Sequence, residues 1–350
     1  MARTPRGDVF DPSEIAIAHV MQRCVRRCFL MGRDPESGRN YNHRKQWLED
    51  RLKHFAAYFG IDLLCFSILS NHFHLVLRSR PDVVATWDDR EVARRWLMIC
   101  PPRKDRHGKP LEPTEAELNS IRLDRRRLRT IRRRLSDMSW WMRLLCQPLA
   151  AMANRQESQL GRFWQGRFRA TRICDEASLL ACAAYVDLNP IRAALAETLE
   201  GSDYTSVQRR IQSLRGDTSP TEPAPDQFLA PLEIDEHRDP VGPVASDSGH
   251  RASDKGFLSM SVTEYIALLD WTARLVVPGK PGTTPAEIPG VLERLGLTEP
   301  QWTGLVRDFG RLFSLAAGLP GTLAGQRTRT TQRPWHVRRS FRELFGATAA

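Results

Sequence analysis

Apolar side chains follow two different periods along the first 80 residues. Three short apolar runs cover residues 15–24, 61–69 and 72–78. Only Ser70 and Asn71 separate the last two runs, a spacing that is typical of a β-hairpin. Residues 44–59 instead carry apolar side chains three and four positions apart, which predicts an amphipathic helix that ends at Gly60. The chain is therefore predicted to open in the order strand, helix, strand, strand.

A helical insertion is predicted to follow the last of these strands. Residues 87–100 predict a helix, and a polar, turn-rich segment comes after it. One long helix is then predicted from an apolar stripe that alternates steps of three and four. The stripe consists of Leu128, Ile131, Leu135, Met138, Met142, Leu145 and Leu149. Residues 163–174 predict an extended segment, and Asp175 is a suitable N-cap for a helix over residues 176–188.

The composition changes between residues 214 and 256. This stretch holds six prolines, clustered Asp and Ser, and few apolar residues, so it predicts a linker or a loosely ordered arm. Beyond it, two helical patterns cover residues 262–275 and 299–315, and a basic tail covers residues 327–342. The chain is therefore expected to end in a second, smaller region.

Together these patterns predict an α+β fold. Over residues 1–213 we expect an antiparallel sheet of ferredoxin-like type with helices on one face, interrupted by a helical insertion at about residues 80–150. The linker then leads to a small, mostly helical accessory region over residues 257–350.

Composition narrows the class of protein. The 350 residues include 52 Lys and Arg against 41 Asp and Glu, a net charge of +11, which suits a polyanionic partner but also simple solubility. No apolar run approaches the ~20 residues of a membrane-spanning helix, and the first residues lack a secretory signal. Seven cysteines without a Cys-x-x-Cys pair indicate neither a disulfide framework nor a zinc ribbon. We expect a cytoplasmic protein with no membrane partner.

Two histidines stand out in the second strand of the predicted hairpin. Residues two apart in a strand project from the same face, so His72 and His74 point together while Phe73 points to the other side. Two adjacent imidazoles can form half of a divalent-metal site. The alternative is a pair of histidines that binds no metal.

A tyrosine and an asparagine are predicted to meet at the end of a helix. Tyr185 and Asn189 are four residues apart and share one helix face. Pro190 disfavours helical geometry at Asn189, so the helix is expected to end or kink there. A phenol can act as a nucleophile and an amide oxygen as a metal ligand. The alternative is an ordinary helix tyrosine followed by a C-cap asparagine.

The two histidines, Tyr185 and Asn189 lie in two of four sequence motifs that follow one another along the chain. They are HVMQRCVRRCFLMG, SNHFHLVL, GRFWQGRFRA and AAYVDLNPIRAAL, and they span roughly residues 15–210. In this order and spacing the chain resembles the IS200/IS605-like single-tyrosine transposases, and more closely the REP-associated tyrosine transposases. It departs from them at Ser70, where the family often has proline, and in its longer arginine-rich insertion.

The resemblance implies both a function and a mechanism. It assigns the nucleophile to Tyr185 and the ligands of a divalent metal, Mg²⁺ or Mn²⁺, to His72, His74 and Asn189. Tyr185 would form a 5′-phosphotyrosine and release a 3′-hydroxyl, so that rejoining needs no nucleotide triphosphate. We therefore expect a transposase that cleaves and rejoins single-stranded or hairpin DNA. It would act as a monomer or a homodimer, and the tyrosine helix would come from the same chain or from the partner chain. A non-cleaving DNA- or RNA-binding descendant and a relaxase or replication-initiator nicking enzyme remain open as alternatives.

Two basic segments are candidates for DNA contact. One segment interleaves aromatic and basic residues, among them Trp164, Arg167 and Arg169. It can stack bases and bind phosphates, or its aromatic residues can simply pack under the tyrosine helix. The second segment is an arginine run that fits a phosphate-tracking surface or a solvated helix face. Its candidate residues are Arg125, Arg126, Arg129, Arg132, Arg133 and Arg134.

Overall fold

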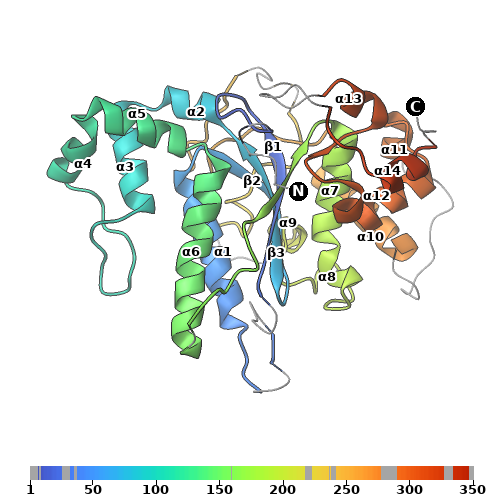
Figure 1. Ribbon diagram of the computed structural model, residues 1–350, viewed down its shortest axis with the longest axis horizontal. Helices are drawn as coiled ribbons and strands as arrows, with labels where there is room; N and C mark the ends of the chain where they lie inside the picture. The colour runs from blue at the N-terminus through green and yellow to red at the C-terminus, as the bar shows by residue number, and fades with distance from the viewer. Residues whose placement is uncertain are drawn as a thin grey trace.

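A computed structural model describes residues 7, 9–25, 32–34, 38–158, 160–216, 223–235, 237, 242–276, 290–326 and 334–346. Its centre is a single five-stranded sheet with the strand order β2–β3–β1–β4–β5 (Figure 1). The strands are β1 (Ile17–Arg23), β2 (Ile61–Ile68), β3 (His72–Ser79), β4 (Arg169–Ile173) and β5 (Ala316–Ala317). Neighbouring strands pair antiparallel, except β4 and β5, which are parallel.

Helices surround this sheet. In chain order they are α1 (His43–Tyr58), α2 (Pro81–Thr86), α3 (Asp89–Ile99), α4 (Glu115–Arg122), α5 (Arg125–Arg134), α6 (Met138–Glu157), α7 (Glu176–Asp187), α8 (Asn189–Arg192), α9 (Ser206–Arg215), α10 (Val262–Val276), α11 (Gly290–Arg294), α12 (Glu299–Leu312), α13 (Pro320–Ala324) and α14 (Arg339–Leu344). Within the described ranges, no helix combines the length and the apolar character needed to cross a membrane.

One face of the sheet packs against α1 and α6 (Figure 1). Strand residues that alternate along the chain supply this face, among them Ala18, Val20 and Leu75, and they lie in one buried core with Phe55 of α1 and Trp141 of α6. The amphipathic pattern of residues 44–59 is the reason that α1 forms here, because its apolar stripe is the surface that the sheet buries.

The opposite face packs against α7 and the C-terminal helices (Figure 1). Val76 and Ile173 of the sheet share a continuous core with Leu180 of α7 and with Leu305 and Phe309 of α12. Since both faces are covered, every residue of β2 is buried. The predicted α+β class, the antiparallel pairing and the mostly helical C-terminal region are confirmed. The expectation of helices on one face is wrong, because α7 and the C-terminal helices cover the second face of the sheet.

The predicted long helix over residues 128–149 is two helices. α5 ends at Arg134 and α6 begins at Met138, although the apolar stripe continues through the break. Asp137 caps α6 by accepting a hydrogen bond from the backbone N–H of Ser139 (2.6 Å), and the Leu135 carbonyl accepts one from the N–H of Gly60 (2.8 Å). Side-chain capping and a long-range backbone partner therefore interrupt the helix while its apolar side chains stay buried.

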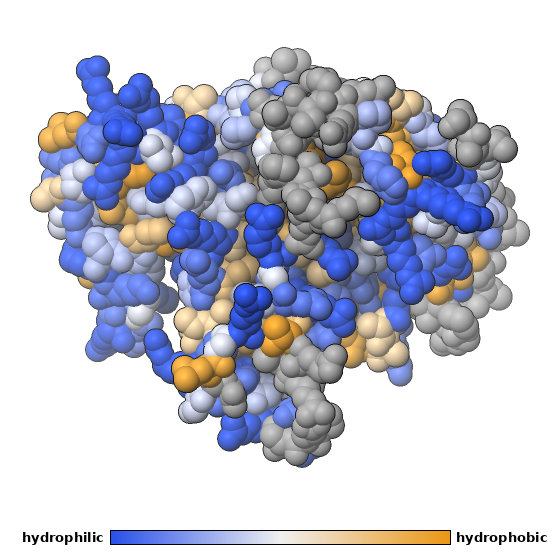
Figure 2. All heavy atoms as spheres, viewed as in Figure 1, coloured by the Kyte–Doolittle hydropathy of each residue, from blue (hydrophilic) through white to orange (hydrophobic). Residues whose placement is uncertain are grey.

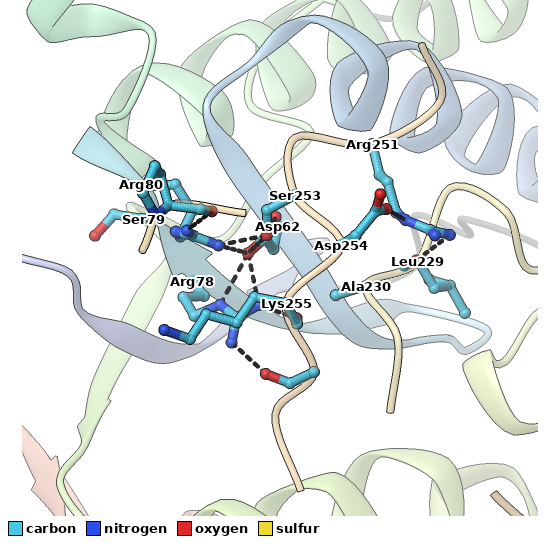
Figure 3. Close-up of polar contacts among 12 residues, drawn as sticks. Asp62, Arg78, Ser79, Arg80, Leu229, Ala230, Arg251, Ser253, Asp254 and Lys255 are labelled. Carbon is cyan, nitrogen blue, oxygen red and sulfur yellow. Dashed lines mark hydrogen bonds and ion pairs between the residues drawn. The ribbon is translucent and has the colours of Figure 1, made fainter. Parts of the chain in front are cut away.

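Parts of the segment 214–256, which composition predicted as a linker, pack against the sheet, and its residues 228–230, 232, 252 and 253 are buried. Ser253 is fully buried, and its hydroxyl donates to the Asp62 carboxylate at the start of β2 (2.9 Å) (Figure 3). Arg78 of β3 donates to Asp62 (2.8 Å) and to the carbonyls of Lys255 and Gly256 (2.5 and 2.8 Å). Hydrogen bonds to a buried ion pair of the sheet thus hold this segment, a long-range contact that composition does not encode.

Candidate active site

Three histidines meet on the face of the sheet that α7 covers. His72 and His74 alternate along β3 and lie with their ring centroids 5.0 Å apart, on the same face as predicted. His19 of the neighbouring strand β1 joins them, because β1 and β3 pair with His19 opposite Val76 and Met21 opposite His74. The His19 and His74 rings are nearly parallel, 5.1 Å apart at 7°, and a hydrogen bond of 2.8 Å joins His19 Nε2 to His74 Nδ1.

Hydrogen bonds leave one nitrogen of each β3 histidine available. His72 Nδ1 lies 2.7 Å from Asn71 Oδ1, so the Nε2 atom of His72 takes no part in that contact. The Nδ1 atom of His74 is in the hydrogen bond with His19. Its Nε2 atom is buried without a hydrogen-bond partner among the described residues. Buried polar atoms without partners are rare, so the His74 Nε2 atom is a position where a bound group would be stabilised.

Helix α7 brings the tyrosine to these histidines. Asp175 begins the helix as its N-cap, accepting a hydrogen bond from the Ser178 N–H (2.9 Å), as the sequence predicted. α7 then packs across β2 and β3 and presents Tyr185 near its end. The Tyr185 ring meets His74 and His19 edge-on, at centroid distances of 5.4 and 5.7 Å.

Asn189 lies one turn beyond Tyr185. α7 ends at Asp187, and Asn189 begins the short helix α8, in agreement with the break expected before Pro190. The Asn189 side chain is nearly buried, and its amide lies near enough to the Tyr185 hydroxyl to lower the pKa of that phenol. Asn189 therefore lies beside Tyr185, as the four-residue spacing predicted, although the two residues belong to consecutive helices.

Burial sets the protonation states of the site. It lowers the pKa of His19 to about 4, and burial together with Arg23 lowers the pKa of His72 to about 4. Burial also lowers the pKa of His74 well below its usual value of 6.5, with contributions from the two neighbouring histidines and Arg192. Burial also raises the pKa of Tyr185, and Arg192 and Asn189 only partly oppose it. At neutral pH the imidazoles are therefore neutral and the phenol is protonated.

A cleft of about 410 Å³ opens onto His19, His74 and Tyr185. Arg167 and Arg169 line it, as does Arg338 from the C-terminal region. Three guanidinium groups beside a tyrosine and two neutral imidazoles make this cleft suited to an anionic ligand.

Trp164 does not line this cleft. Its indole N–H donates to the Cys146 carbonyl (2.7 Å), and its ring packs edge-on against Phe73 and Phe163. The structure therefore separates the predicted aromatic and basic segment: Arg167 and Arg169 lie at the cleft, while Trp164 packs under α6.

The C-terminal region contributes directly to the site. Phe309 of α12 stacks on Tyr185 at 5.7 Å and 28°, and a side-chain carbon added at Gly310 would lie 3.3 Å from the Tyr185 hydroxyl oxygen. Arg192 lies over the Tyr185 ring at 5.1 Å and donates to the Arg307 carbonyl of α12. Glycine at position 310 therefore leaves room for the hydroxyl, and the region predicted as an accessory forms one wall of the site.

The arginine run lies elsewhere, on α5 in the insertion. α3, α4 and α5 form the end of the molecule on the far side of α6 from α7, and hydrophilic side chains gather there (Figures 1 and 2). Arg132 is held within the protein by the carbonyls of Val84 and Trp87 (2.9 and 2.7 Å) and by Asp89, and Arg134 stacks on Trp140 at 4.0 Å. The exposed candidates are Arg125, Arg126, Arg129 and Arg133.

The side chains that could together bind a divalent metal are the two imidazoles of His72 and His74 and the amide of Asn189. In the part of the chain that the structure describes, no three His, Cys, Asp or Glu side chains are grouped to hold a metal ion. His72 and His74 each use Nδ1 in a hydrogen bond and keep Nε2 out of it, and the His74 Nε2 atom is buried without a partner among the described residues. These residues fit a metal that takes mixed nitrogen and oxygen ligands.

Sequence reasoning did not find His19. It alternates with Ile17 and Met21 on β1 as any inward-facing strand residue does, so its own segment carries no distinguishing signal. Its role depends on the pairing of β1 with β3, which the sequence pattern does not specify.

Comparisons with known proteins give limited results. No protein-family model matches the chain, and no curated protein matches it. A solved structure of a REP-associated tyrosine transposase bound to a REP hairpin is similar over 58% of this chain and 82% of that chain, with 12% sequence identity and a TM-score of 0.33. Similarity at this level establishes neither a shared site nor a shared function.

Proposed function

We propose that the protein is a metal-dependent DNA endonuclease and strand transferase, a transposase of the single-tyrosine type, that acts on single-stranded or hairpin DNA. The observation that carries this proposal is the meeting of Tyr185 with His74 at 5.4 Å, from elements more than 100 residues apart, in a cleft lined by arginines. The four sequence motifs also support it, because they contain His74, Tyr185 and the arginines of the cleft segment.

Tyr185 is the nucleophile in this proposal. Its hydroxyl oxygen attacks the scissile phosphorus, a new oxygen–phosphorus bond forms, and the bond from phosphorus to the 3′ oxygen breaks. The products are a 5′-phosphotyrosine and a 3′-hydroxyl, which carries the proton equivalent that Tyr185 loses. Because the phosphodiester energy is conserved, the 3′-hydroxyl of another strand can reverse the step. Arg192 assists by stabilising the negative charge that develops on the Tyr185 oxygen.

His72, His74 and Asn189 would hold Mg²⁺ or Mn²⁺. When bound there, such an ion neutralises charge on the scissile phosphate and stabilises the leaving oxygen. The neutral state of both imidazoles suits this role, since only an unprotonated nitrogen can be a ligand. Arg167, Arg169 and Arg338 would bind the adjoining backbone phosphates.

A covalent-adduct assay tests the proposal. Labelled single-stranded hairpin DNA is incubated with the protein and Mn²⁺, and a protein–DNA adduct is sought on denaturing gels. Tyr185→Phe should abolish the adduct while DNA binding stays nearly intact, because only the hydroxyl is removed. Tyr204→Phe is the matched control, since the Tyr204 hydroxyl bonds Gln46 (3.2 Å) outside the cleft, and it should form the adduct as the wild type does.

The other outcomes distinguish the rival functions. DNA binding without any adduct in the wild type would favour a non-cleaving binding protein. Nicking of supercoiled duplex DNA, with no reaction on hairpins, would favour a relaxase or replication-initiator enzyme. An adduct that persists in Tyr185→Phe would refute the assignment of the nucleophile.

A further inference from the structure

We propose that His19 is a positioning residue for His74: it accepts the His74 Nδ1 proton and so turns the lone pair of His74 Nε2 toward the position of the bound metal. This inference rests on the proposed function, because it concerns the same site. It starts from two observations, the 2.8 Å hydrogen bond between His19 Nε2 and His74 Nδ1 and the buried, unpartnered His74 Nε2.

The hydrogen bond allows two arrangements of protons. If His19 donates, His74 carries its own proton on Nε2, and a buried N–H is left without an acceptor. If His74 donates from Nδ1, its Nε2 presents a lone pair instead. Orphaned buried N–H groups are rarer in proteins than buried acceptors without a donor, so the second arrangement is favoured.

The neighbouring histidine shows the same proton arrangement by a separate contact. His72 Nδ1 lies 2.7 Å from Asn71 Oδ1, and a carbonyl oxygen can only accept. His72 therefore carries its proton on Nδ1 and presents the lone pair of Nε2. With His19 accepting from His74, both β3 histidines present an unprotonated Nε2, the form in which an imidazole nitrogen can bind a metal ion.

The surroundings of His19 hold its ring in place. Only 7% of the residue is exposed, its ring lies nearly parallel to that of His74, and Phe309 meets it edge-on at 5.7 Å. β1 is also an inner strand, paired with β3 on one side and β4 on the other. A ring fixed in this way can impose one proton arrangement on His74, whereas a mobile acceptor could not.

The proton arrangement can be measured without cleavage or metal. In protein labelled with ¹⁵N-histidine, the two-bond couplings between ring nitrogens and carbon-bound protons identify the protonated nitrogen. We expect the proton of His74 on Nδ1 in the wild type and a mixture of both forms in His19→Leu. A wild-type His74 protonated on Nε2 would overturn the proposal.

Metal titration gives a second readout. His19→Leu should weaken Mn²⁺ binding by about 10- to 100-fold, the usual effect of losing a group that orients a ligand. His19→Gln should restore much of the affinity, because its amide oxygen can accept the same proton. His54→Leu is the matched control: His54 of α1 also makes one ring hydrogen bond, to the Met98 carbonyl (2.9 Å), but lies outside the cleft. It should leave Mn²⁺ binding unchanged.

The two readouts separate failure of this inference from failure of the proposed function. Unchanged Mn²⁺ affinity in folded His19→Leu would overturn the positioning role. A wild-type protein that binds no Mn²⁺ would refute the proposed metal chemistry, and the His74 proton position would still decide whether His19 acts on His74. Circular dichroism of each variant confirms folding, and His19→Gln supplies the comparison if His19→Leu does not fold.

Discussion

The exposed arginines of α5 should make DNA binding strongly dependent on salt. Arg125, Arg129 and Arg133 are spaced by four residues, so they follow one another along the helix at about 6 Å steps, with Arg126 beside the first. Their apolar neighbours Leu128 and Ile131 face the core, which leaves the arginine side chains on the outer surface. If each binds one phosphate, it replaces a condensed counterion on the DNA.

The perturbation is the fourfold variant in which Arg125, Arg126, Arg129 and Arg133 become Gln. For single strands each neutralised phosphate contributes about −0.7 to the slope of log affinity against log salt, so the slope should flatten by up to roughly 2.8. Between 50 and 200 mM salt, the wild type should then lose up to roughly 50-fold more affinity than the variant. All sequences should be affected alike, because phosphate contacts carry no base information.

The assay is fluorescence anisotropy with one labelled hairpin and one scrambled strand at several KCl concentrations. Arg132→Gln is the control, because Arg132 is held by the Val84 and Trp87 carbonyls and by Asp89. It should reduce stability and leave the salt slope unchanged. A folded fourfold variant with the wild-type slope would refute the reasoning and identify α5 as a solvated helix face.

Three further predictions concern the fold. Asp62→Ala should lower the free energy of unfolding by about 3–5 kcal/mol in urea titrations, because it leaves two buried guanidinium groups without their shared carboxylate; a loss below 1 kcal/mol would contradict this. Gly256→Ala should lower the melting temperature, since its new carbon would lie 1.9 Å from the Glu233 carbonyl oxygen, whereas Gly321→Ala meets nothing within 4 Å and should not. Hydrogen bonds, first from Arg103 and then from Thr114, lower the pKa of Glu117 to about 2, so its stabilisation is present above pH 4.5 and lost toward pH 2. Acid unfolding of Glu117→Gln, followed by tryptophan fluorescence, should lack that part of the pH dependence.

Local patterns in the sequence determined the elements and some of the site. Strand alternation put His72 and His74 on one face, and the four-residue spacing of Tyr185 and Asn189 put Asn189 one turn beyond Tyr185, across the junction of α7 and α8. Asp175 marked the start of that helix through its capping side chain. These features depend on residues within one or two turns of each other, so the order of side chains along the chain is sufficient to predict them.

Only the tertiary structure decided what surrounds those residues. The contact of His19 with His74 depends on strand register, and the stacking of Phe309 on Tyr185 joins residues 124 positions apart. The break after Arg134 depends in part on a hydrogen bond from Gly60, while the burial of Ser253 depends on the carboxylate of Asp62. Each of these contacts joins segments distant in sequence, and its energy comes from burial and partner geometry that exist only once the chain has folded.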